Sequence, residues 1–283
     1  MKIKLNGVDA DIKPENEKTI GEILGALDAW LTGSGHRLSG LIIDGKTVNA
    51  REMELSFSRG IETVDTIDIC TSSLPQLVAE SLTRTIRDIE DFQAAGFDEK
   101  AAFSGNWKES PQGCLLAEQY PELFDWTIKA FSGDGCSPQV LTALFEERLR
   151  ELLDPAGEMG RIAHLVDDIC ARLTEFPLDI QTGKDAKAAE TVNVFSGVAE
   201  KIFRIYNTLK FERAAADVTV DNMPISDYIT EFSKALKELL DAYERRDTVL
   251  IGDLAEYEMA PRLRGLYAAV WGIVKGENYE HSV

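Results

Sequence analysis

The chain has 283 residues and an apolar fraction of 44%, which is enough to bury a core in one large or two modest domains. Its 30 basic and 49 acidic side chains give a net charge of −19. This charge argues against nucleic acid and against acidic lipid surfaces as partners, because both attract basic surfaces.

The location of the protein is predicted from its hydropathy. No apolar run approaches the ~20 residues that a membrane-spanning helix needs. Residues 1–13 alternate apolar and polar side chains and lack the continuous apolar stretch of a secretory signal. We therefore expect a cytoplasmic protein.

The negative charge is unevenly divided along the chain. Residues 1–73 hold 8 basic and 12 acidic side chains, so most of the excess falls beyond them. The simplest interpretation of an acidic surface is solubility, and the alternative is a docking face for a basic partner.

The chain has four cysteines, and no two of them form a C-x-x-C pair. In a chain expected in the cytoplasm, such cysteines are more often free, mostly buried thiols than disulfides. The four are Cys70, Cys114, Cys136 and Cys170.

The first 72 residues carry signals of two hairpins, one helix and a closing strand. Asn6-Gly7 and Asp44-Gly45 each separate short apolar runs, which indicates two-residue hairpin turns. Between them, Thr19 and Glu22 form a capping box at the start of a predicted helix. Residues 65–69 predict the last strand. The predicted helix carries apolar residues at helical spacing: Ile20, Ile23, Leu24, Leu27, Trp30 and Leu31.

This order of elements resembles the β-grasp, or ubiquitin-like, fold, in which one helix packs on a small mixed sheet. The resemblance rests on the two hairpin turns, the helix that starts at Thr19 and the closing strand. Sulfur carriers and conjugated modifiers of that fold end in a free Gly-Gly, whereas this domain continues through Cys70-Thr71-Ser72-Ser73. The resemblance therefore implies a docking module without carrier chemistry.

The remainder of the chain, residues 74–283, reads as a series of helices. Ser73, Asp154, Ser226 and Asp247 are predicted N-caps, and Pro177 is a predicted helix end. A long irregular connection is expected at 96–120. The predicted helices lie at about 74–95, 121–131, 138–153, 156–176, 185–210, 226–246 and 248–274.

The last four predicted helices have similar lengths and apolar spacings, so we expect a four-helix bundle core at about 156–275. Charged residues at 146–151 are interpreted as a solvated face. Residues 218–220 form either a brief strand or an extended linker. Pro261 lies inside the last helical pattern and predicts a kink there.

The predicted fold class is α+β: an N-terminal β-grasp domain at 1–72, followed by an all-α helical bundle domain at 74–283. In this layout the whole chain resembles uncharacterised bacterial proteins that join a β-grasp domain to helices. That resemblance brings no activity with it.

Signatures of catalysis are absent from the sequence. It contains no Walker-type or dinucleotide-binding glycine loop and no G-x-S-x-G elbow. A carboxylate-bridged metal pair needs histidines on two helices, and His36, His164 and His281 do not supply them. Cys170 follows His164 by six residues, so the two fall on different faces of one helix. We expect no metal, no cofactor and no catalytic residue.

The densest mixture of acidic and apolar residues lies at 247–271. Leu250, Leu254 and Tyr257 are predicted to share one helical face, with Asp253, Glu256 and Glu258 among or beside them. These acids either face the bundle as a polar cluster or form a solvated face, and the solvated face is favoured. Nearby arginines that can pair with them are Arg245, Arg246, Arg262 and Arg264.

Two functions are compared on this basis. The favoured hypothesis is a non-catalytic cytosolic adaptor whose partner is another protein of unknown identity. A chaperone of an assembly system is one form of it, since flagellar export chaperones are acidic helical bundles. The alternative is an enzyme or small-ligand binder with a site between the bundle and the 96–120 loop, near Trp107.

Overall fold

The structure is a computed structural model that describes residues 1–283 except 13, 15, 211–217 and 277–283. The chain divides into two compact units, Met1–Phe145 and Glu146–Val283, and the division falls inside helix α7 (Pro138–Leu153). One cluster of buried apolar residues runs from Ile3 to Ile69, and a larger one runs from Met159 to Ile273. The two clusters belong to different units.

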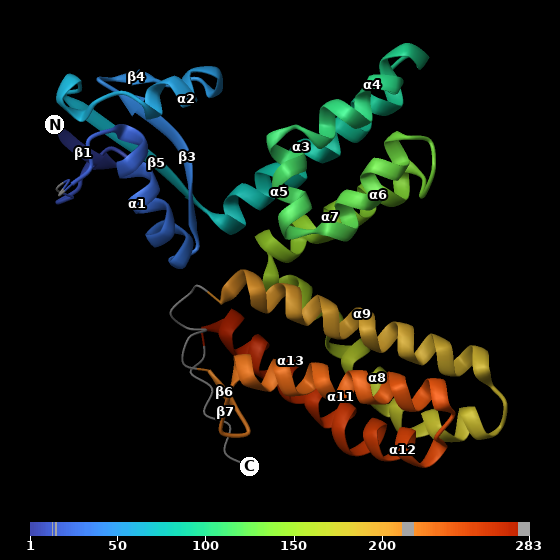
Figure 1. The fold of residues 1–283 in the computed structure, drawn as a ribbon. Helices are drawn as coiled ribbons and strands as arrows, with labels where there is room; N and C mark the ends of the chain where they lie inside the picture. Colours follow the sequence, from blue (N-terminus) through green and yellow to red (C-terminus); the bar gives the residue numbers. More distant parts are fainter. Residues whose placement is uncertain (13, 15, 211–217, 277–283) are drawn as a thin grey trace. The chain divides into compact units, whose positions relative to one another are not determined.

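A five-stranded mixed sheet forms the N-terminal part (Figure 1). Its order is β2-β1-β5-β3-β4, with β1 and β5 parallel and the other neighbours antiparallel. Both predicted hairpin turns are confirmed, since Asn6, Gly7, Asp44 and Gly45 all have positive φ. The strands are β1 (Lys2–Leu5), β2 (Val8–Asp9), β3 (His36–Ile43), β4 (Lys46–Thr47) and β5 (Thr66–Ser73).

Helix α1 (Ile20–Gly33) packs on this sheet. Its predicted capping box is confirmed, because Thr19 accepts from the Glu22 backbone and Glu22 accepts in return. Trp30 does not share the buried face and is 61% exposed. The buried residues of α1 are Ile20, Ile23, Leu24 and Leu31.

The N-terminal part also holds elements that were not predicted. Helix α2 (Ala50–Phe57) and the short 3-10 helix η1 (Ile61–Thr63) lie between β4 and β5. The closing strand is longer than expected and runs directly into α3 (Leu74–Ala94), where Ser73 is the predicted N-cap and accepts from the Gln76 backbone.

The irregular connection predicted at 96–120 is wrong. The structure has α4 (Phe97–Lys108) and α5 (Pro111–Gln119) there, followed by α6 (Pro121–Phe131) and α7. The prolines and Gly96 mark helix starts, since Gly96 caps α4 and Pro111 and Pro121 occupy the first turns of α5 and α6, whereas Gly105 and Gly113 lie within helices.

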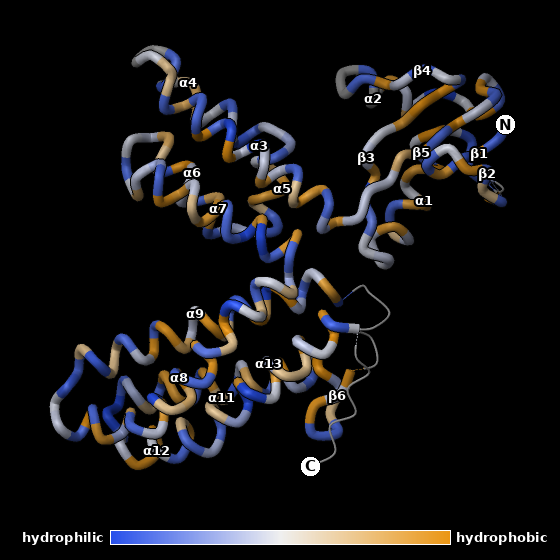
Figure 2. The backbone as a smooth tube through the Cα atoms, turned by 180° about the vertical axis from the view of Figure 1, so that it is seen from behind, coloured by the Kyte–Doolittle hydropathy of each residue, from blue (hydrophilic) through white to orange (hydrophobic). Residues whose placement is uncertain are grey.

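The second unit holds four long helices and two short helical segments among its described residues. They are α8 (Pro155–Gln181), α9 (Asp185–Leu209), α11 (Ile225–Arg245), α12 (Thr248–Asp253), the π-helical segment η2 (Leu254–Met259) and α13 (Ala260–Lys275). Figure 2 shows hydrophobic residues recurring along these helices, as expected for helices that each bury one face. The caps predicted at Asp154 and Asp247 are confirmed.

Three local predictions in this unit change. Helix α8 continues through Pro177, which lies inside it and packs its ring toward Gly252 of α12. Helix α11 begins at Ile225 after Pro224, so Ser226 is not its cap. Residues 218–220 lead into a strand, because β6 (Thr219–Val220) pairs with β7 (Met223–Pro224) across a turn whose two residues have positive φ.

At the coarse level the α+β class is confirmed: a mixed sheet comes first and a mostly helical chain follows. Among the described residues, none of the helices combines the length and apolar character needed to cross a bilayer.

Candidate interaction face on α12 and η2

The residues predicted as a polar cluster lie on one short stretch of backbone, α12 and η2. Asp253, Glu256 and Tyr257 are exposed there, and Tyr257 keeps 68% of its surface in contact with solvent. Asp253 and Glu256 therefore face outward and not toward the core of the unit. The favoured interpretation of a solvated acidic face agrees with this placement.

The predicted apolar face of this stretch is wrong in register. Of Leu250, Leu254 and Tyr257, only Leu254 is buried. The most deeply buried residues of the stretch instead follow one another at intervals of four: Ile251, Ala255, Met259 and Leu263, each 0% exposed. Because a regular α-helix turns every 3.6 residues, a run of such intervals stays on one face only where the turns widen, as they do in a π-helix.

Pro261 explains why the turns widen at this point. It stands in the first turn of α13, directly after η2, and has no backbone N–H for the carbonyl four residues back. Its ring would also clash with that carbonyl, which belongs to Tyr257, in a regular helix. The wider turns of η2 therefore accommodate Pro261, at the position where a kink was predicted.

Glu258 has a different environment from its neighbours. Its carboxylate accepts from Arg262 at 2.8 Å (Nε) and 2.7 Å (Nη2), which confirms the expected pairing with a nearby arginine. Arg262 lies over the ring of Tyr228, whose hydroxyl donates to the Arg262 carbonyl oxygen at 3.1 Å. Burial raises the pKa of Tyr228 to about 12. Glu258 therefore connects η2 to the core of the unit.

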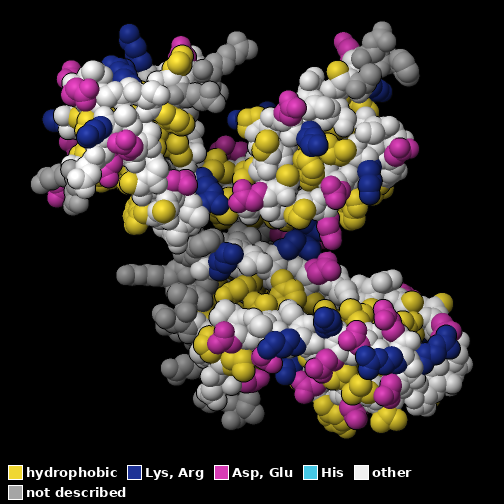
Figure 3. Space-filling view, in the orientation of Figure 1, with side chains coloured by type: hydrophobic (Ala, Val, Ile, Leu, Met, Phe, Trp, Pro, Cys, Tyr) yellow, Lys and Arg dark blue, Asp and Glu magenta, His cyan; other side chains and the backbone are white. Residues whose placement is uncertain are grey.

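The outward side of α12 and η2 combines acidic and apolar side chains. Val249, Leu250 and Tyr257 are exposed apolar residues that follow helical spacing with Asp253 and Glu256. Within the described part of the chain, no lysine or arginine forms an ion pair with Asp253 or Glu256. Figure 3 shows hydrophobic and acidic side chains interspersed over the region that α12 occupies in Figure 1. These five residues are called the α12–η2 face.

Trp107 belongs to the other unit and is a core residue. It is 3% exposed and stacks on Phe124 with ring centroids 5.5 Å apart. Its indole N–H is buried and has no hydrogen-bond partner among the described residues. Phe103 and Phe131 complete an aromatic cluster around it. Trp107 is therefore part of the core of its own unit, whereas Asp253 and Glu256 are exposed residues of the other unit.

A buried charge network is the polar feature that the sequence did not predict. Glu151 of α7 and Glu158 of α8 are only 1% and 2% exposed, so the expectation of a solvated face at 146–151 is wrong for Glu151. Arg204 of α9 binds Glu151 through two nitrogens, at 2.9 and 3.0 Å. Lys201 lies 2.6 Å from Glu158, 2.9 Å from Glu147 and 3.9 Å from Glu151.

Further arginines complete this network at its edge. Arg148 contacts Glu151 at 3.1 Å, Arg150 contacts Glu158 at 3.1 Å, and Arg161 also binds Glu158. Each buried carboxylate therefore has at least two cationic neighbours, as a buried charge requires. The sequence signal was the spacing of Glu147 and Glu151 by four and of Lys201 and Arg204 by three, which places each pair on one helix face.

The network favours the ionised forms of Glu147, Glu158 and Lys201. Burial alone would raise the pKa of Glu158, but the hydrogen bond from Lys201 and the charges of Lys201 and Arg161 outweigh it, so the pKa lies below its usual value. The same balance lowers the pKa of Glu147. Burial works to lower the pKa of Lys201, but its two glutamates raise it overall. The ion pairs of these groups hold α9 against α7 and α8.

The remaining candidates for chemistry give no cluster. The described residues contain no group of three or more His, Cys, Asp or Glu side chains suited to a metal ion. His281 lies outside the described residues. All four cysteines are free, but only Cys170 is buried; Cys70 and Cys136 are partly buried and Cys114 is exposed. Burial raises the pKa of the Cys170 thiol, which donates to the Ala260 carbonyl.

The described residues define a protein of the α+β class, in which a mixed sheet is followed by a mostly helical region with a buried ionic network. Residues 1–73 match a family described as the TP0873 N-terminal domain, and residues 158–269 match a domain of unknown function, DUF8042. The chain is also similar to an uncharacterized protein of Treponema pallidum (strain Nichols), at 23% identity over 266 residues and 94% of each chain. No solved structure matches the chain.

Proposed function

We propose that the protein is a non-catalytic cytosolic adaptor that binds another protein through the α12–η2 face. In this proposal residues 1–72 are a β-grasp domain and residues 74–283 are a helical domain with a four-helix bundle core at about 156–275. The sheet order β2-β1-β5-β3-β4, with parallel β1 and β5 and one helix packed across it, supports the β-grasp assignment.

The observation that carries the proposal is the composition of the α12–η2 face. Val249 and Tyr257 are large apolar residues, 71% and 68% exposed, and acids without cationic partners in the described chain stand between them. An amphipathic segment with apolar side chains flanked by lysine or arginine complements this face in both respects. Tyr257 supplies the rigid aromatic anchor that interfaces favour.

The backbone beneath the face also supports a binding role. π-helical turns are rare and occur often at functional sites. Here the π-helical turns bury Leu254, Ala255 and Met259, while Glu256 and Tyr257 remain exposed. The side chains of the α12–η2 face are therefore carried by helical backbone that packs on the core of the unit, and not by a loop.

The experiment places a photo-crosslinking amino acid at Tyr257 in cells, with the exposed position Leu153 as the matched control. We expect a discrete cross-linked protein from Tyr257 that is absent from Leu153. The purified partner should then bind the wild-type chain and lose about tenfold or more in affinity to Asp253→Lys/Glu256→Lys, because like charges now meet.

The proposal would be abandoned if the cross-linked protein binds the charge-reversed variant equally well, or if Tyr257 cross-links no protein. A basic partner should also bind more weakly as salt concentration rises, since exposed charges are screened. Binding that is indifferent to salt would contradict the charge complementarity on which the proposal rests.

A further inference from the structure

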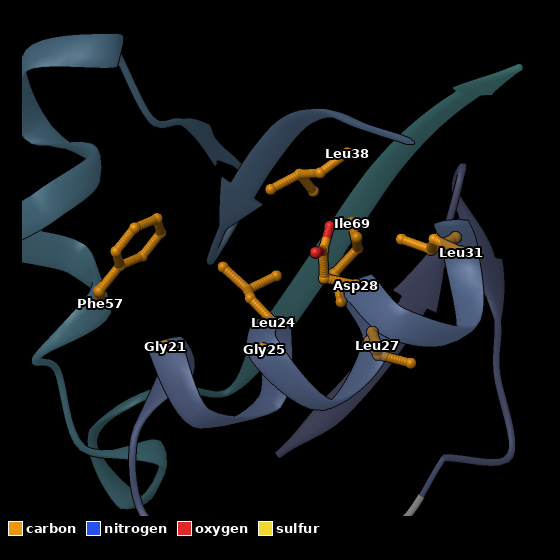
Figure 4. A pocket seen from close by; sticks show the side chains of 9 residues that line it. All are labelled: Gly21, Leu24, Gly25, Leu27, Asp28, Leu31, Leu38, Phe57 and Ile69. Carbon is orange, nitrogen blue, oxygen red and sulfur yellow. The ribbon is translucent and has the colours of Figure 1, made fainter. Parts of the chain in front are cut away.

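An open apolar groove lies on the N-terminal sheet domain, beside α1. Its walls come from α1, from Phe57 at the end of α2, and from Leu38 of β3 and Ile69 of β5 (Figure 4). Its volume is about 290 Å³. The residues of α1 that line it are Gly21, Leu24, Gly25, Leu27, Asp28 and Leu31.

Two glycines of α1 give the groove its shape. A Cβ at Gly21 would meet Phe57 at 3.0 Å, so Gly21 lets the end of α2 approach α1 closely. A Cβ at Gly25 would meet nothing within 4 Å, so Gly25 leaves the floor open. Glycine inside a helix costs stability relative to alanine. An open glycine in the floor of an apolar groove is therefore a feature that folding does not require.

The groove carries one carboxylate among apolar side chains. Figure 4 shows Asp28 projecting from α1 between Leu24 and Leu31, with its carboxylate toward the strands. No lysine or arginine of the described chain forms an ion pair with Asp28. A carboxylate at the mouth of an apolar groove favours a ligand that brings both apolar surface and a positive charge.

The size of the groove selects among such ligands. A cavity of ~150 Å³ holds one benzene-sized group, so a groove of about 290 Å³ takes one or two side chains. It lies at the lower limit of the ~300–1,000 Å³ range of small-molecule and cofactor sites. One or two apolar anchors next to a cation describe a short segment of a protein chain.

We propose that this groove binds a peptide segment of a protein partner, inserting one or two apolar side chains and pairing a lysine or arginine with Asp28. This surface lies in the unit Met1–Phe145, whereas the α12–η2 face lies in the unit Glu146–Val283. The groove proposal goes beyond the proposed function and holds whether or not the α12–η2 face has a partner.

The test selects binders on the full chain from a displayed library of random peptides about 12 residues long. We expect enriched sequences that share one or two large apolar residues with a lysine or arginine within about one helical turn. The affinity of a synthetic copy is then measured against matched variants. Methyl NMR shifts of Leu24, Leu27 and Leu38 on titration would place the peptide in the groove.

Gly25→Leu fills the floor of the groove and should weaken peptide binding about tenfold or more, whereas Asp28→Asn should weaken it about threefold to tenfold. Gly105→Leu is the matched control, since Gly105 is another helical glycine with nothing within 4 Å of its Cβ position. It should leave the affinity unchanged. The thermal midpoint of Gly25→Leu reports whether the domain stays folded.

Asp28→Asn keeps the proposal falsifiable should Gly25→Leu fail to fold. The proposal is overturned if no peptide is enriched, if enriched peptides are acidic, or if their affinity is the same for Asp28→Asn and the wild type. It is also overturned if the groove binds a second copy of this chain, which would appear as a dimer that Gly25→Leu or Asp28→Asn converts to monomer.

Discussion

At the scale of single residues, Lys201 has the largest predicted effect on stability. It lies within 4 Å of three glutamates, two of which are almost fully buried. We expect Lys201→Met to lower the free energy of unfolding by about 3 kcal/mol, because it removes a cation that compensates the buried carboxylates. Urea denaturation of the full chain, followed by circular dichroism, measures this change.

Arg150→Met is the control for that prediction. Arg150 contacts the same Glu158, but its own side chain is half exposed, so its removal should cost less than about 1 kcal/mol. Replacing Lys201 and Glu158 together by methionine should recover part of the loss, since no unpaired charge remains on that pair. If Lys201→Met and Arg150→Met lowered the free energy of unfolding equally, the burial of a cation would not determine its contribution to the network.

Residue-scale prediction succeeded where the chemistry is local. The predicted turns and caps depend only on residues that are close in the sequence. Each has its predicted role in the structure: the turns at Asn6-Gly7 and Asp44-Gly45, and the caps Thr19 and Asp247. Glu151 could not be predicted in the same way. Its partner Arg204 is 53 residues away, and only the packing of α9 on α7 decides that this charged face is buried.

At the scale of elements, α13 makes close contact with α11 and with strand β6. A Cβ at Gly265 would approach the Tyr228 hydroxyl oxygen to 2.7 Å and Val220 to 3.2 Å. We expect Gly265→Ala to destabilise the unit by about 1–3 kcal/mol, because overpacking outweighs the gain of about 1 kcal/mol in helix propensity. Thermal unfolding gives the comparison with the wild type.

Tyr228→Phe supplies the matched background for this prediction. It removes the hydroxyl that Gly265→Ala would meet, together with its hydrogen bond to the Arg262 carbonyl. The cost of Gly265→Ala in this background should fall by about 1 kcal/mol or more, which a double-mutant cycle measures. Additive effects of the two substitutions would mean that the helix shifts and that the contact does not limit packing.

The prediction of helices failed where a proline, or a weak pattern of apolar residues, was compatible with more than one structure. Pro177 and Pro261 both lie within helical patterns, and the sequence does not say whether the chain ends, bends or widens at each. The structure continues α8 through Pro177 and places η2 before Pro261. Helix α2 was missed because its eight residues are on average slightly polar and it is only about two turns long.

At the scale of the whole molecule, pH acts on stability through both net charge and local pairs. The chain carries a net charge of −19 at pH 7 and has an isoelectric point near 4.6, so overall repulsion is smallest near that pH. The ion pairs of the network act differently. Glu147 and Glu158 have pKa values below 4.5 when folded, so their contribution is present above 4.5 and is lost as pH falls through the folded pKa.

The stability of the folded chain at alkaline pH depends on groups whose pKa is raised on folding. Lys201 contributes stability below its usual pKa of 10.5 and loses it as pH rises through the higher folded pKa. Tyr228 stays neutral up to about 12 when folded but ionises near 10 when unfolded, so its contribution is lost over that interval. Both groups therefore destabilise the folded chain above about pH 10.

Together these signs predict a plateau of stability between about pH 5 and 10, with losses on both sides. Below the isoelectric point, protonation of the buried glutamates and rising positive charge act in the same direction, so the acid limb should be steep. The urea midpoint measured against pH tests this, and Lys201→Met should flatten the acid limb because Glu158 loses a cation that lowers its pKa. A midpoint that rises as pH falls from 5 to 3 would contradict the ionised network, since only carboxylates that are protonated in the folded state gain stability in acid.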